Sequence, residues 1–122
     1  MTNQEMFNLA VKGLASQQWT QARRSFAEGH VGCAYTAANG SRCAWGWVDP
    51  TLALETGGVR TLRERKIGLA AGLDHAQINF AADLQDAHDS GWQPEVMHRN
   101  FIQLAKRYEL DWPTDVPQSL EL

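Results

Sequence analysis

The stretch from Gly32 to Val48 reads Gly-Cys-Ala-Tyr-Thr-Ala-Ala-Asn-Gly-Ser-Arg-Cys-Ala-Trp-Gly-Trp-Val, and it decides the predicted fold. Two apolar, aromatic-rich runs flank Asn39-Gly40, a pair that is typical of the two-residue turn of a β-hairpin. The patterns elsewhere in the chain predict helices and loops, so this hairpin would be the only sheet. We therefore predict an α+β fold, mostly helical, in which four to five helices pack around one β-hairpin at about 31–48.

The register of this hairpin decides which side chains share a face. Alternate residues of a strand point the same way, which gives one row of Cys43, Trp45 and Trp47 and another of Cys33 and Tyr35. The Asn-Gly pair favours a two-residue loop, which puts the two rows on opposite faces. A three-residue loop would put both rows on one face.

Capping signals and apolar periodicity predict the helices. Thr2 and Glu5 have the spacing of a capping box before an apolar stripe, which predicts a first helix over 3–16. The polar residues 17–30 would be an irregular extension or a second short helix. Similar signals predict further helices at 50–55, at 59–66, from Asp74 to about Asp89, and from Pro94 onward.

Length and composition predict one globular domain. A chain of 122 residues buries roughly two-thirds of its unfolded surface. Residues 1–110 would form this domain, and 111–122 a proline-containing C-terminal tail. The net charge of -3 disfavours binding to double-stranded nucleic acid, although it leaves a single nucleotide as a ligand. No apolar run has the ~20 residues that span a membrane, and two cysteines without an export signal predict a cytoplasmic protein.

Three motifs of the chain carry a resemblance to a family. They are Cys33-Ala34-Tyr35, Gly40-Ser41-Arg42-Cys43-Ala44-Trp45-Gly46 and Leu84-Gln85-Asp86-Ala87-His88-Asp89. In this order of motifs the chain resembles a family of small uncharacterised proteins from phages and prophage-bearing bacteria, from the first helix to Leu110. Thr36 departs from the family, where an arginine follows the tyrosine, so no ligand role is expected there. The resemblance implies an accessory protein of a mobile element and supplies no mechanism.

The leading site prediction is a ligand-binding surface on the hairpin and on the helix that carries His88. It comprises Tyr35, Arg42, Trp45, Trp47, Gln85, His88 and Asp89. The aromatic row would stack a base or another flat ligand, and the polar helix residues would bind sugar hydroxyls or amides. Packing of the tryptophans and of His88 in the core is the alternative.

The predicted function is therefore binding rather than catalysis. The chain would be a phage-type accessory protein, such as a counter-defence protein, that sequesters a small nucleotide-like ligand or blocks a host defence protein. The sequence leaves open whether the chain forms a homo-oligomer, and we predict no cofactor.

Two alternative functions use the cysteines. Cys33 or Cys43 with His88 has the residue types of a cysteine-dependent hydrolase or transferase. Asp89 follows His88 directly and would point about 100° away around the helix, so we expect it not to orient the imidazole. The other alternative is a small structural zinc-binding domain with ligands from His30, Cys33, Cys43 and His88, although the Cys-x9-Cys spacing is looser than in most zinc sites.

Overall fold

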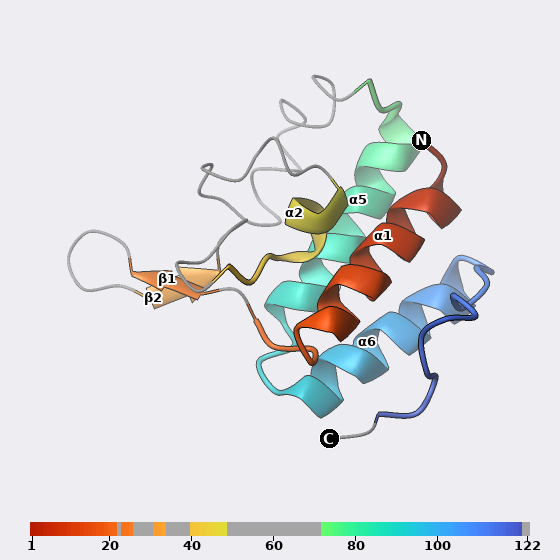
Figure 1. The fold of residues 1–122 in the computed structure, drawn as a ribbon. Helices are drawn as coiled ribbons and strands as arrows, with labels where there is room; N and C mark the ends of the chain where they lie inside the picture. The colour runs from red at the N-terminus through yellow and green to blue at the C-terminus, as the bar shows by residue number, and fades with distance from the viewer. Residues whose placement is uncertain (22, 26–30, 34–39, 49–71, 121–122) are drawn as a thin grey trace.

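The computed structural model describes residues 1–21, 23–25, 31–33, 40–48 and 72–120. Three long helices dominate this part of the chain: α1 (Asn3–Ser16), α5 (His75–Asp89) and α6 (Pro94–Arg107). They lie side by side, and the short helix α2 (Ala44–Val48) packs against α1 and α5 (Figure 1). None of the helices described is long and apolar enough to cross a membrane.

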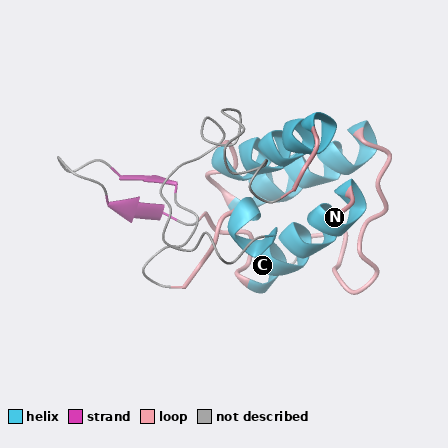
Figure 2. Ribbon diagram, turned by 90° about the horizontal axis from the view of Figure 1, so that it is seen from above, coloured by secondary structure: helices cyan, strands magenta, loops and turns pink. Residues whose placement is uncertain are grey.

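The predicted β-hairpin at 31–48 is wrong, and so is the α+β fold class. Its second half forms helix α2, in which the Trp47 N–H bonds the Cys43 carbonyl at 3.3 Å. Strand β2 (Val31–Cys33) pairs antiparallel with β1 (Arg23–Ser25) instead, as a short ribbon at the edge of the helices (Figure 2). A short apolar run fits a strand and a buried helix equally well, and burial of α2 among the long helices decides between them here.

Two further predictions concern the segment 17–30 and the helices between residues 50 and 66. The segment 17–30, predicted as an extension or a short helix, contains a turn after α1 and then strand β1. The predicted helices at 50–55 and 59–66 lie outside the described residues, as does Asn39 of the predicted turn.

The starts of α1 and α5 confirm the predictions made from capping signals. Thr2 Oγ1 accepts a hydrogen bond from Glu5 N at 3.1 Å, and Glu5 Oε1 accepts one from Thr2 N at 3.2 Å. Hydrogen bonds from the backbone N–H of Thr2 and from its hydroxyl lower the pKa of the Glu5 carboxyl. Asp74 and Gln77 make the same reciprocal pair at the start of α5. The final helix starts at Pro94 as predicted.

The core lies where the helices meet, and its largest fully buried side chains come from all four. They are Met6, Phe7, Leu14, Trp45, Ile78, Phe80, Leu84, His88, Met97 and Phe101. Each helix thus contributes apolar side chains to one shared core. Packing of these side chains against the other helices stabilises each helix, as is normal for amphipathic helices.

An aromatic cluster fastens the segment after α6 onto this core. Trp19 and Trp112 stack with their ring centroids 6.0 Å apart, and His98 meets Trp19 edge-on at 5.0 Å. Burial lowers the pKa of His98, although the nearby backbone of Pro117 and Gln118 opposes the shift. The segment that follows α6 is therefore part of the packed structure up to Leu120.

Candidate functional site

The structure divides the predicted site residues into two groups. Arg42 and Trp47 lie near an open groove beside the C-terminal end of α1. Trp45, Gln85 and His88 are buried in the core, with the half-buried Asp89 beside them. Tyr35 lies outside the described residues.

The groove beside α1 has a volume of about 370 Å³. Its lining consists of Ser16, Gln17, Thr20, Gly40, Ser41 and Trp47. Hydroxyl and amide groups thus surround one indole, and none of these lining residues carries a carboxylate. Such a surface offers hydrogen bonds and an aromatic contact to a polar ligand without repelling an anion.

Arg42 adds a positive charge next to this groove. Its Cζ lies over the Trp47 indole, 5.0 Å from the ring centroid, which is a cation–π contact. Among the described residues, acidic side chains pair with Lys12, His88 and Arg107, and Arg42 takes part in none of these pairs. Within the described part of the chain, the guanidinium is therefore contacted by an aromatic ring and not by a carboxylate.

Helix α1 holds the Trp47 indole in place. A Cβ atom on Gly13 would lie 2.1 Å from Trp47 Cδ2 and 2.2 Å from Cγ, so only glycine allows the helix backbone to pack against this ring. Gln17 Oε1 accepts a hydrogen bond from Trp47 Nε1 at 3.1 Å. The indole thus has both a packing surface and a polar anchor on α1.

The second group of predicted residues forms a hydrogen-bonded chain between α2 and α5. Gln85 Oε1 accepts from Trp45 N at 3.0 Å, and Gln85 Nε2 donates to Asp89 Oδ1 at 2.8 Å. The same carboxylate oxygen lies 2.9 Å from His88 Nδ1. These polar groups therefore bond to one another and to the first turn of α2, which joins the two helices.

The expectation that Asp89 cannot orient His88 is wrong. The helical-wheel angle separates their Cβ directions, but the Asp89 side chain turns back so that its carboxylate reaches the ring nitrogen. Such contacts between adjacent residues depend on side-chain torsions, which the wheel does not represent.

Cys43 does not have the environment of a nucleophile. Its side chain is fully buried, and burial raises the pKa of the thiol to about 12. Gly46 N donates to Cys43 Sγ at 3.3 Å, so the sulfur is a hydrogen-bond acceptor for the first turn of α2. A protonated, enclosed thiol is unreactive at neutral pH.

The zinc hypothesis finds no support among the side chains described. No three histidine, cysteine or acidic side chains of this part of the chain come together as metal ligands. His30 and the side chain of Cys33 lie outside it, so the complete predicted set is not seen.

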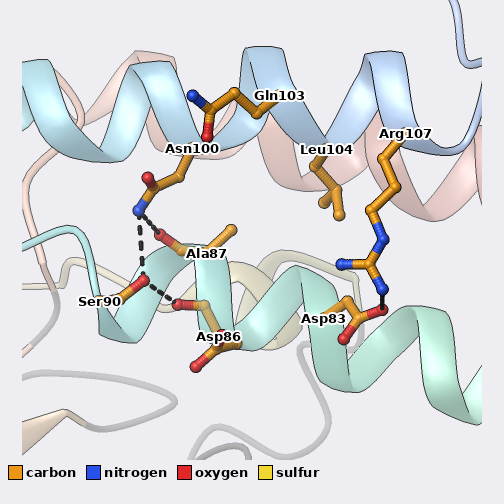
Figure 3. A pocket seen from close by; sticks show the side chains of 8 residues that line it. All are labelled: Asp83, Asp86, Ala87, Ser90, Asn100, Gln103, Leu104 and Arg107. Atoms are coloured by element: carbon orange, nitrogen blue, oxygen red, sulfur yellow. Dashed lines mark hydrogen bonds and ion pairs between the residues drawn. The ribbon is translucent and has the colours of Figure 1, made fainter.

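A second groove lies between α5 and α6 (Figure 3) and has a volume of about 250 Å³. Its polar groups largely bond to one another: Arg107 pairs with Asp83 at 3.4 Å, and Asn100 Nδ2 donates to the Ala87 carbonyl and to Ser90 Oγ. It also contains Asp86. Two carboxylates make this groove unfavourable for an anion, in contrast to the groove beside α1.

Two residues that hold the Trp47 indole beside this groove were not predicted from the sequence, Gly13 and Gln17. Gly13 interrupts an otherwise regular helical pattern, and an interior helix glycine is a signal of close approach by another group. Gln17 gives no such signal, because its partners, Arg42 and Trp47, are 25 and 30 positions away in the chain.

The chain matches no family model, and comparisons with curated proteins and with solved structures found no similar protein. The assignment of residue roles therefore depends on the geometry above.

Proposed function

We propose that this protein binds and sequesters a small nucleotide-like anion in the groove beside α1. In this proposal it acts as an accessory protein of a mobile element in the cytoplasm of the host cell, where such ligands are abundant. The resemblance of its motifs to phage and prophage proteins supports the setting, and the groove supports the ligand class.

One observation carries the proposal, namely the Arg42 guanidinium lying over the Trp47 indole at the edge of a groove whose described lining residues carry no carboxylate. Arginine is the side chain that best matches phosphate oxygens, because its planar fork donates two parallel hydrogen bonds. Indole and guanidinium planes both stack on nucleobases. The pair thus presents the two chemistries that a nucleotide needs within one surface.

The other groove residues fit the remaining parts of such a ligand. Ser16 Oγ and Thr20 Oγ1 line the groove. Each donates its own proton to a carbonyl of the protein, of Gly13 and Gln17 respectively, so each can still accept a hydrogen bond from a sugar hydroxyl. Gln85, His88 and Asp89, predicted for this role, bond within the protein instead. We therefore move the sugar-binding role from α5 to the groove beside α1.

Calorimetric titration with adenosine monophosphate, guanosine monophosphate, adenosine and inorganic phosphate tests the proposal. We expect a nucleotide to bind more tightly than its nucleoside, and Arg42→Ala to weaken nucleotide binding at least about tenfold. Arg107→Ala is the matched control, because this arginine lies in the acidic groove between α5 and α6. Wild-type protein that binds none of the probes overturns the function, and full binding by Arg42→Ala overturns the site.

A further inference from the structure

The carboxamide of Gln17 uses its whole hydrogen-bonding capacity on the protein. Nε2 donates to the carbonyls of Thr20 at 2.8 Å and Arg42 at 2.7 Å. Oε1 accepts from Arg42 N at 3.0 Å and from Trp47 Nε1 at 3.1 Å. A primary amide has two donor hydrogens and two acceptor lone pairs, so this one is saturated. Gln17 lines the groove but has no hydrogen bond left for a ligand.

We propose that Gln17 is the positioning residue of the groove beside α1. It fixes the backbone of Arg42 and the indole of Trp47 in the arrangement that receives the anion, and it makes no hydrogen bond to the ligand itself. This inference rests on the proposed function, because it describes how that site is kept ready for binding.

The turn that carries Gln17 supports this role. Gln18 and Trp19 follow it with φ angles of 59° each, a left-handed conformation that is unfavourable for residues other than glycine. Trp19 is buried in the aromatic cluster with His98 and Trp112, and this packing holds the strained turn. Backbone strain of this kind persists where the surrounding structure imposes it, often next to functional sites. Packing of Trp19 in the core therefore fixes the turn that directly follows Gln17.

Helix α1 offers a matched control at its other end. Gln4 Nε2 donates to the Asp111 carbonyl at 2.9 Å, and Gln4 Oε1 accepts from Asp111 N at 2.9 Å. Both glutamines thus clamp the backbone of one distant residue in the same way. The two lie 13 positions apart, or roughly 20 Å along a helix, so the Gln4 clamp is remote from the groove.

The test compares Gln17→Met with Gln4→Met. Both variants are titrated with adenosine monophosphate, and the indole N–H signal of Trp47, assigned with Trp47→Phe, is followed by NMR without ligand. We expect Gln17→Met to weaken binding about tenfold and to shift the Trp47 signal, because the indole loses its acceptor. Gln4→Met should change neither. Helix content by circular dichroism shows that both variants are folded.

The outcomes separate the inference from the proposed function. If wild-type protein does not bind, the proposed function fails and the inference with it. If wild type and Gln17→Met bind equally, the inference alone fails. Weaker binding with an unmoved Trp47 signal would mean that Gln17 contacts the ligand directly, which also overturns positioning.

Gln17→Glu gives a second test that needs no ligand. Its carboxylate loses both donations to the Thr20 and Arg42 carbonyls, and protonation below a pH of about 4.3 restores one donor. We expect the Trp47 indole signal of this variant to move toward the wild-type position as the pH falls from about 7 to about 4. A Trp47 signal that matches wild type over this whole range contradicts the inference.

Discussion

The two ends of helix α1 are held by different means. At the N-terminal end, Thr2 and Glu5 cap each other locally, and Gln4 clamps the segment after α6 at Asp111. At the C-terminal end no glycine stops the helix. The turn there contains two left-handed non-glycine residues, Gln18 and Trp19, whose conformation depends on packing of distant aromatic rings.

This difference separates the end of α1 that borders the proposed binding groove from the end that does not. A local capping box stabilises a helix whatever lies elsewhere in the chain, so the N-terminal end is a structural support. The C-terminal end contains backbone in an unfavourable conformation and an interior glycine. The same end holds Trp47 and Arg42 beside a groove. A sequence that follows local backbone and residue preferences at most positions, and departs from them at a few, often does so at a functional surface.

The largest expected effect tests the contact between α1 and α2. In Gly13→Ala the new methyl group would overlap the Trp47 indole, so the ring must shift, and a shift perturbs its hydrogen bond to Gln17. Overpacking of this kind outweighs the higher helix propensity of alanine, so we expect a net loss of about 2 kcal/mol in the free energy of unfolding. Urea denaturation measures it.

A double-mutant cycle shows whether the indole is the cause. In a Trp47→Leu background the smaller side chain leaves room, and Gly13→Ala should then be neutral or stabilising by up to about 1 kcal/mol. An equal loss in both backgrounds would show that Gly13 is required for a reason unrelated to Trp47.

A medium effect is expected at the locally capped end. Thr2→Ala removes the acceptor for Glu5 N and should lower the free energy of unfolding by about 1 kcal/mol. Because the cap is remote from the groove, this variant should bind adenosine monophosphate as wild type does. A change in affinity would contradict the separation between a structural end and a functional end of α1.

The same contrast explains what the sequence allowed us to predict. Helices α1 and α5 start at capping boxes within four residues, Thr2 with Glu5 and Asp74 with Gln77, and such signals can be read locally. The prediction of a strand at α2 is wrong because apolar residues alternate there as they do in a strand. Contacts with distant residues stabilise a helix instead, including the hydrogen bond with Gln85, 40 positions away. Without the fold, no local pattern identifies such a partner.

The candidate site shows the same difference between local signals and contacts with distant residues. Arg42 and Trp47 were predicted from their residue types, since an arginine among aromatic residues is a recognisable stacking surface. Their grouping with Gln85 and His88 assumed a pocket between the His88 helix and a hairpin that does not form. The actual partner, Gln17, lies in a polar stretch whose turn is determined by the burial of Trp19.

The smallest expected effect concerns the strained turn itself. Gln18 is exposed and has a φ angle of 59°, which glycine adopts without a steric penalty. Gln18→Gly should therefore raise the free energy of unfolding by about 0.5 kcal/mol, after the larger entropy of the unfolded glycine chain is subtracted. Gln17→Gly is the contrasting variant, since Gln17 has negative φ and would lose its side-chain bonds, so it should be destabilising. If Gln18→Gly is destabilising instead, the left-handed turn is not strained, and the two ends of α1 differ only in which distant segment each one holds.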